Sequence, residues 1–202
     1  MNVAVLASGA GTNLQALLDN VHGTEGIEIV AVASDKPDAA ALGRARRAEV
    51  PVRAFPAAEY AGRADRDRAM ADWLAECRAE LVVLAGYMQL LSGQFLSRFP
   101  SRVINVHPAL LPAFPGLTPV DDALAYGVKV FGVTVHFVDD GVDTGPVILQ
   151  RAIELPDARD QNEVLARLHP IEHELLPEAV RLIARGAVSF DPANPRRVVI
   201  ER

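Results

Sequence analysis

Short runs of Val, Ile, Leu and Ala recur along the first half of the chain, and they constrain its fold more than any other feature. The runs are VAVLA at 3–7, IEIVAVAS at 27–34, LVVLAG at 81–86 and RVINVH at 102–107. Stretches with helical spacing separate them, among them NLQALLDNV and RADRDRAMADWLAECRA. Nearly continuous apolar strands that alternate with helices are typical of a parallel sheet that is covered on both faces. The pattern predicts an α/β protein with a doubly wound, mostly parallel sheet.

The pattern changes after residue 107. PALLPAFPGLTP is a proline-rich loop, and two further strands are predicted at VFGVTVHFV and GPVILQRAIEL. A long amphipathic helix follows, in which Pro170 and Pro177 are expected to cause a kink or a restart. The expected core face of this helix is formed by Leu165, Leu168, Leu175, Leu176, Ala179 and Ile183. The final PANPRRVVIER is expected either to add an edge strand or to remain loose.

The composition and charge of the chain argue against several classes of function. The formal net charge is −6 and no basic patch stands out, which argues against a nucleic-acid partner. Cys77 is the only cysteine, so disulfides and thiolate metal clusters are not expected. No signal peptide or membrane-spanning run is recognisable. We therefore expect a cytoplasmic protein that acts on small molecules, without a membrane partner, as a monomer or a homodimer.

A glycine loop, SGAGTN, joins the first strand to the first helix. Gly9 and Gly11 permit backbone conformations that other residues avoid, and Thr12 or Asn13 is a candidate cap for the helix. Free N–H groups at such a helix start attract anions. The spacing matches neither the dinucleotide nor the Walker fingerprint, so phosphate binding and a plain tight turn both remain open.

Polar side chains follow the strand VINVH. Asn105 and His107 share one strand face by period-two alternation, and ligands of parallel sheets bind beyond the carboxyl ends of the strands. Three hypotheses for His107 compete: a buried structural histidine, a catalytic group, or a metal ligand together with His136 and an aspartate. The chain lacks tight metal-ligand spacing, which disfavours a metal.

An asparagine beside a histidine suits the transfer of an acyl group to an amine. The asparagine donates an N–H to the oxygen on which charge builds, while the histidine moves the proton. A nearby aspartate would stabilise the charged histidine. Since no Ser or Cys is poised as a nucleophile, direct transfer between two bound substrates is favoured.

Four segments together resemble the folate-dependent formyltransferases. They are VAVLASGAGTNLQALLD, LVVLAGYMQLLS, INVHPALLPAFPG and VTVHFVDDGVDTGPVILQ. The SGAGTN loop and the compact length point, within that superfamily, to the phosphoribosylglycinamide formyltransferases. The resemblance implies a formyltransferase-like Rossmann-type fold and one domain over 1–202. It implies a phosphate-binding half at 1–100, a folate-binding and catalytic half at 101–190, and a tail at 191–202.

The resemblance also implies an activity and a set of residues. The activity is direct formyl transfer from 10-formyltetrahydrofolate to the amine of glycinamide ribonucleotide in purine synthesis, without a metal. The catalytic residues would be Asn105, His107 and Asp143. Acceptor contacts would come from Gly11, Thr12, Asn13, Arg63, His169 and Glu172. The pterin pocket, largely backbone, would be formed by Met88, Gln89, Leu90, Leu91, Asp139, Asp140, Gly141 and Val142.

The chain departs from the family pattern around this site. Gln89 stands where Arg or Lys is common, Thr118 and Asp121 replace a histidine and often an arginine, and His169 and Pro170 are unusual in their helix. Related functions therefore stay open: formyl transfer to another amine, hydrolysis of 10-formyltetrahydrofolate, or a non-catalytic module that binds folate or a nucleotide phosphate. Arg63, Arg66 and Arg68 lie in one charge-rich stretch, and most of the three are expected to be solvated surface residues.

Overall fold

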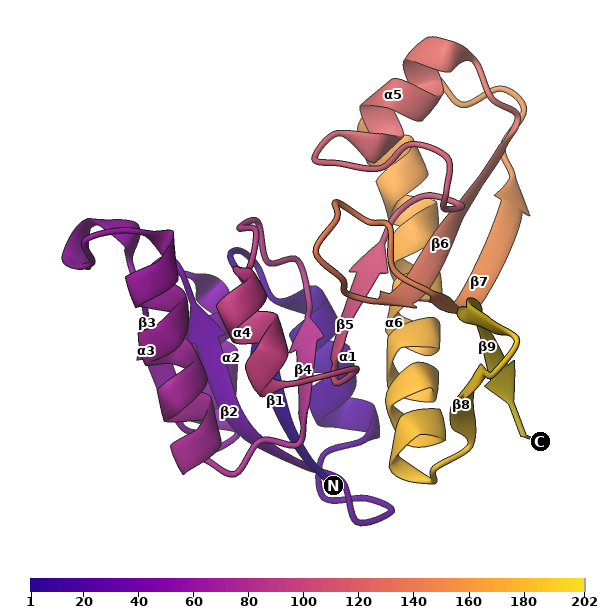
Figure 1. Ribbon diagram of the computed structural model, residues 1–202. Coiled ribbons are helices and arrows are strands. Elements are labelled where there is room, and N and C mark those ends of the chain that lie inside the picture. Colours follow the sequence, from indigo (N-terminus) through magenta and orange to yellow (C-terminus); the bar gives the residue numbers. More distant parts are fainter. Residues whose placement is uncertain (202) are drawn as a thin grey trace. The chain divides into compact units, whose positions relative to one another are not determined.

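A computed structural model describes residues 1–201, and it divides into two compact units, Met1–Ile104 and Asn105–Arg202 (Figure 1). Nine strands are described, and their pairings are both parallel and antiparallel. The predicted class is confirmed: the protein is an α/β protein with a mixed, mostly parallel sheet. Strand β5 (Val103–His107) spans the boundary between the units, so that its last three residues begin the second one.

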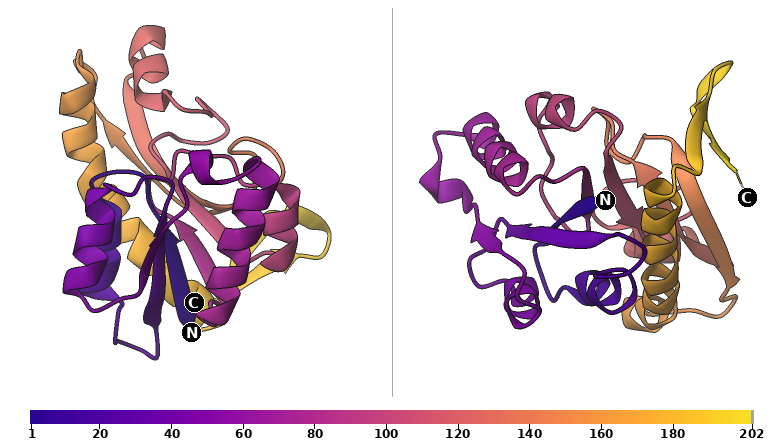
Figure 2. Two further views of the ribbon diagram at one scale, coloured as in Figure 1. Left: turned by 90° about the vertical axis from the view of Figure 1, so that its left-hand side faces the viewer. Right: turned by 90° about the horizontal axis from the view of Figure 1, so that it is seen from below.

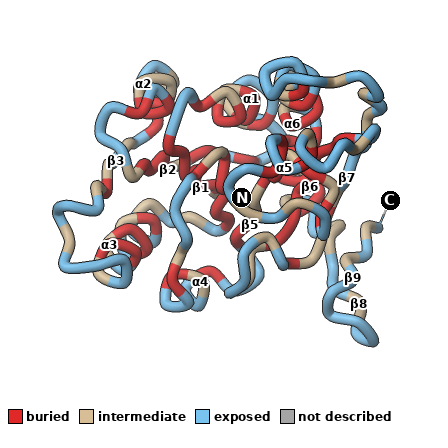
Figure 3. Tube along the Cα trace, turned by 90° about the horizontal axis from the view of Figure 1, so that it is seen from above, coloured by how far each residue is buried: buried red, intermediate tan, exposed pale blue. Residues whose placement is uncertain are grey.

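The first unit has four strands in the order β3-β2-β1-β4, each paired in parallel with its neighbour. Helices α1 and α2 cover one face of these strands and α3 and α4 cover the other (Figures 2 and 3). Because both faces are covered, β4 and all of β1 except Asn2 are apolar, and Val3 to Leu6 and Leu81 to Leu84 are buried. The elements are β1 (Asn2–Leu6), α1 (Thr12–Asn20), β2 (Glu28–Ser34), α2 (Ala40–Arg47), β3 (Val52–Ala54), a 3₁₀ turn η1 (Ala57–Glu59), α3 (Arg63–Glu76), β4 (Leu81–Leu84) and α4 (Gly93–Arg98).

The second unit is built around an antiparallel pair, β6 (Val130–Phe137) and β7 (Val147–Glu154). Helix α6 (Gln161–Ala184) packs along both strands, and α5 (Pro119–Tyr126) packs against α6 (Figure 1). A hairpin of β8 (Val188–Asp191) and β9 (Asn194–Ile200) follows, and β9 pairs in parallel with β7. Of the two expectations for the C-terminal segment, the structure supports the added strand.

Helix α6 continues through Pro170 and Pro177, so of the two predicted effects, a kink or a restart, the restart does not occur. Each proline removes one backbone hydrogen bond. The helix is nevertheless continuous over 24 residues, and a long buried face holds it. Of the predicted core face, Leu165 is half-buried and the others are buried. Packing of an apolar stripe therefore outweighs the local cost of the two prolines.

Candidate active site

Asn105 and His107 lie at the carboxyl end of β5, with Val106 between them. Successive side chains of a strand alternate between its faces, so the carboxamide and the imidazole share one face, as the sequence predicted. His107 is 4 % exposed, while Asn105 is only half-buried. Pro108 follows and lacks the N–H that would continue the strand ladder. The two side chains are thus presented at the point where the strand ends.

Asp143 brings a carboxylate to His107. Its Oδ2 lies 3.5 Å from Nδ1 of His107, while Nε2 of His107 lies 2.9 Å from the carbonyl oxygen of Phe114. Both ring nitrogens therefore face oxygen acceptors. An imidazolium, which carries a proton on each nitrogen, satisfies both contacts at once. The arrangement suits a histidine that holds a proton ready for transfer.

His136 orients Asn105. Nδ1 of His136 is 2.8 Å from the carbonyl oxygen of Phe137, which accepts its proton and leaves a lone pair on Nε2. Burial lowers the pKa of His136, although Asp143 and the Phe137 carbonyl oppose the shift, so the ring stays neutral. Nε2 then accepts the hydrogen bond from Nδ2 of Asn105 at 3.2 Å. The carboxamide nitrogen is thereby directed toward His136 and Asp143, whose Oδ1 lies 3.4 Å from it.

The loop between β6 and β7 places Asp143. Asp143 adopts a left-handed backbone with φ 52°, a conformation that Asp tolerates better than most residues. Oδ1 of Asp139 braces the loop by accepting hydrogen bonds from Gly141 N at 3.1 Å and from Thr144 Oγ1 at 2.6 Å. Of the residues predicted for cofactor binding here, Asp140, Gly141 and Val142 are exposed, whereas the carboxylate of Asp139 serves the loop itself.

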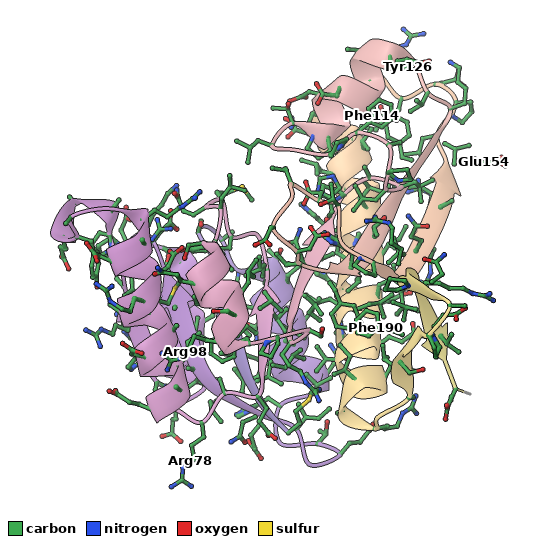
Figure 4. All side chains as sticks on the ribbon, viewed as in Figure 1. Arg78, Arg98, Phe114, Tyr126, Glu154 and Phe190 are labelled. Atoms are coloured by element: carbon green, nitrogen blue, oxygen red, sulfur yellow. The ribbon has the colours of Figure 1, made fainter. Side chains whose placement is uncertain are left out.

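The proline-rich loop after β5 covers the acid–base pair. The Phe114 carbonyl meets His107, and the N–H of Gly116 donates to Oδ2 of Asp143 at 2.8 Å. The Phe114 ring packs edge-on against Tyr126 of α5, with centroids 5.9 Å apart (Figure 4). These contacts make residues 112–118 a cover over His107 and Asp143. The resemblance implies that this loop covers the active site, but the particular partners left no signal in the sequence, since they are a backbone carbonyl and a backbone amide.

The glycine loop belongs to the first unit. Gly11 has φ 72° and is the N-cap of α1, so the predicted capping by Thr12 or Asn13 was wrong. A Cβ at Gly11 would lie 2.7 Å from Cβ of Ala41. Arg44 donates from Nε to the Ala10 carbonyl at 2.8 Å and thereby fixes the loop from the outside. The first turn of α1 has no acidic residue that would repel an anion, and phosphate binding at this helix start stays a prediction.

The segment 88–91 follows β4, in the same unit. Met88 N donates to Ser8 Oγ at 2.9 Å, and the side chains of Met88, Gln89 and Leu90 are exposed. The backbone N–H groups of Gln89, Leu90 and Leu91 donate to no other residue within 1–201. The segment therefore has backbone N–H groups available to a ligand. A pterin pocket formed largely by backbone groups, which stays a prediction, would need such groups.

The arginines near the start of α3 differ in environment. Arg63, predicted to contact substrate, is the first residue of α3 and is exposed, as is Arg68. Arg66 is only 3 % exposed and pairs with Asp67, which is fully buried. Most of the three arginines are thus exposed, as expected, and Arg66 is the exception. The charge-rich sequence gave no sign of which arginine turns inward.

His169 and Glu172 lie on α6 in the second unit. Glu172 is 5 % exposed, and His169 is half-buried with its ring stacked over His173 at 6.3 Å. Burial lowers the pKa of His173, and His169 adds to the shift while Glu172 opposes it. One turn of helix thus brings a carboxylate and an imidazole together, the two groups predicted to contact the acceptor.

Within residues 1–201, no three side chains of His, Cys, Asp or Glu are grouped as ligands of a metal ion. Over the same range, no helix combines the length and apolar character that a membrane crossing needs.

Comparison with known proteins shows the family to which this chain belongs. Residues 1–180 match the model of the family described as formyl transferase, and the chain belongs to that family. Within it, the chain groups with the phosphoribosylglycinamide formyltransferases, as predicted. It is 44% identical over 187 residues to the Mycobacterium tuberculosis enzyme of that name, covering 93% of this chain and 86% of the relative.

A solved structure and a larger relative agree with this grouping. The glycinamide ribonucleotide transformylase 1 of Symbiobacterium toebii has a TM-score of 0.95 and 45% identity, over 100% of this chain and 94% of that one. The trifunctional purine biosynthetic protein adenosine-3 of Drosophila melanogaster is 39% identical over 193 residues. That match covers 94% of this chain and only 14% of the fly protein.

Proposed function

We propose that this chain transfers the formyl group of 10-formyltetrahydrofolate directly to the amine of glycinamide ribonucleotide. The observation that carries the proposal is the cluster of Asn105, His107 and Asp143, in which a neutral His136 orients the carboxamide. Family membership supports the reaction class. The cluster contains a hydrogen-bond donor for an oxyanion and a proton carrier, the two groups that amine acylation requires.

The formyl group moves from donor to acceptor without a covalent enzyme intermediate. The acceptor nitrogen attacks the formyl carbon, a C–N bond forms, and the carbonyl electron pair moves onto oxygen, where an N–H of Asn105 meets it. The attacking nitrogen gives up a proton. His107 donates its own proton to N10 of the folate as the bond from N10 to the formyl carbon breaks, and the acceptor's proton restores the imidazolium. Asp143 holds that charge in place.

Two contacts within the site have to change during this reaction. Both N–H groups of Asn105 are directed at His136 and Asp143, and the longer bond, at 3.4 Å to Asp143, is the one to exchange for the formyl oxygen. The Phe114 carbonyl also has to release Nε2 of His107. The loop 112–118 therefore opens when substrates bind and closes over them afterwards.

Each unit contributes binding groups. In the first unit, the amides at Gly11, Thr12 and Asn13 bind the phosphate of the acceptor, Arg63 supports this binding, and the backbone of 88–91 binds the pterin. In the second unit, the exposed loop 139–142 is a separate candidate for folate contacts. Glu172 binds the ribose hydroxyls, and His169 adds a polar group beside it. The reaction needs no metal ion.

A steady-state assay of tetrahydrofolate release, with and without glycinamide ribonucleotide, tests the proposal. We expect release only when the acceptor is present. We also expect His107→Ala to reduce transfer at least about a hundredfold, the range of general acid–base catalysis. Release without the acceptor would indicate a hydrolase, and folate binding without turnover would indicate a binding module. Near-normal transfer by His107→Ala would overturn the mechanism.

A further inference from the structure

The segment 88–92 has no helix or strand of its own, and side chains from elsewhere in the first unit hold it at both ends. Ser8 accepts from Met88 N at one end, and Oδ2 of Asp67 accepts from Ser92 N at 2.7 Å at the other. Between these ends, the side-chain amide of Gln89 donates to Oδ2 of Asp35 at 3.2 Å. The free backbone amides of 89–91 are therefore presented by a frame of side chains.

One buried guanidinium organises much of that frame. Nε and Nη2 of Arg66 both donate to Oδ1 of Asp67, at 3.0 and 2.8 Å, which leaves Oδ2 of Asp67 for Ser92. Nη1 of Arg66 donates to Oε1 of Gln89 at 3.4 Å. Arg66 thus reaches one end of the segment through Asp67 and the middle of it directly. The neighbouring Arg68 is exposed and pairs with Asp65.

The surroundings keep this arginine charged. Burial acts to lower the pKa of Arg66, but Asp67, Tyr87 and Asp35 outweigh it and the pKa is raised. The hydroxyl of Tyr87 and Oδ1 of Asp35 are themselves buried and have no hydrogen-bond partner within the described residues. A buried ion pair is a poor source of net stability, because desolvation offsets its attraction. Fixing one geometry is the better-supported use of such a pair here.

We propose that Arg66 is a positioning residue for the folate co-substrate: through Asp67 and Gln89 it sets the backbone of residues 89–91 to bind the pterin. The inference rests on the folate-dependent function proposed above. Arg66 itself need not touch the ligand. Its contribution is a preorganised backbone, so its loss weakens folate binding and leaves the chemistry and the acceptor site intact.

The test pairs two substitutions. Arg66→Met alone leaves the buried Asp67 charge without a partner and threatens folding. Arg66→Met combined with Asp67→Asn removes both charges and retains an oxygen that can accept from Ser92 N. We expect the KM for 10-formyltetrahydrofolate to rise roughly tenfold, the effect of one lost charge-assisted hydrogen bond. The kcat and the KM for glycinamide ribonucleotide should stay within about twofold of the wild type.

Matched variants separate positioning from a merely structural role. Arg68→Met, which changes an exposed arginine of the same helix, should leave all three constants unchanged. Arg66→Lys keeps the charge but lacks the fork that reaches Gln89, so its KM for folate should be intermediate. A structural role would lower the active fraction, and hence kcat, in every assay without changing one KM alone. An unchanged folate KM in the folded double variant, or an equal rise for both substrates, overturns the proposal.

Hydrogen exchange provides a measurement that does not depend on turnover. The amides of Met88 and Ser92, the two in this segment that donate hydrogen bonds, should exchange faster in the double variant than in the wild type or in Arg68→Met. Unchanged exchange overturns the positioning role. A direct titration of the wild type with tetrahydrofolate tests the proposed function separately. If the wild type binds no tetrahydrofolate but exchange is still faster in the double variant, Arg66 does position the segment, and the folate-dependent function is the part that is wrong.

Discussion

The carboxamide nitrogen of Asn105 lies 3.2 Å from Nε2 of His136, on a ring whose other nitrogen is bound to the Phe137 carbonyl. Thirty-one positions separate the two residues in sequence. Because the Phe137 carbonyl accepts a hydrogen bond from Nδ1 of His136, the proton lies on Nδ1 and Nε2 has a lone pair. The amide nitrogen of Asn105, and not its oxygen, therefore faces Nε2. A buried neutral histidine therefore determines the orientation of the proposed oxyanion donor.

Replacement of His136 by phenylalanine should lower kcat without a comparable change in either KM. Phe fills the buried volume but removes the acceptor, so the amide of Asn105 loses one of the two groups that orient it. One lost hydrogen bond predicts a fall of about three- to tenfold. Steady-state kinetics measure it. His136→Gln, which restores a side-chain acceptor, should recover part of the loss, and equal kcat values for the Phe variant and the wild type would contradict the orienting role.

Replacement of Asp143 by asparagine should reduce kcat by about a hundredfold with little change in stability. Asn tolerates the left-handed backbone at this position and preserves the shape of the side chain, but it removes the charge beside His107. Kinetics at saturating substrates and thermal unfolding should be measured on the same preparations. Asp157→Asn, at an exposed position of the second unit that has no part in the proposed site, is the matched control. A large loss of Tm would indicate that Asp143 serves the loop and not the chemistry.

The sequence predicted the elements that depend on local periodicity. The apolar runs at 3–7, 27–34, 81–86 and 102–107 correspond to β1, β2, β4 and β5 within two residues at each end. Period-two alternation also placed Asn105 and His107 on one face, because that property belongs to a single strand. The features that could be predicted are those whose cause lies within a few residues of their position.

The features that could not be predicted from the sequence depend on contacts with residues far away along the chain. Arg66 and Arg68 stand in one charged stretch, and only the fold shows that Arg66 turns toward Asp67 and Gln89. The oxygen that contacts Nε2 of His107 is the backbone carbonyl of Phe114, and because every residue has a backbone carbonyl, no sequence motif identifies it. Helix α6 is a third case, because its buried stripe keeps the helix continuous where its two prolines had left a restart open.

Acidification should destabilise the protein through His136. Its pKa is lowered in the folded state, so between that value and the ordinary 6.5 the unfolded chain binds more protons. The free energy of unfolding therefore rises with pH across this window and falls as the pH drops from 7.5 to 5.5, by at most about 1.4 kcal/mol per pH unit for this residue. Urea unfolding at several pH values measures the slope. His136→Phe should flatten it, and equal slopes in both proteins would contradict the prediction.

Gly145 and Gly43 should respond in opposite ways to the same added methyl group. A Cβ at Gly145 would lie 1.7 Å from the carbonyl oxygen of Phe137, so the backbone that leads to Asp143 has to move. Gly145→Ala should cost several kcal/mol of unfolding free energy, about 3 or more, and should also lower kcat. At Gly43, inside α2, the nearest atom is the flexible end of Arg47 at 3.7 Å, and Ala should stabilise by about 0.5–1 kcal/mol. Thermal unfolding of both variants provides the comparison, and a neutral Gly145→Ala would mean that this loop is not held as closely as the structure shows.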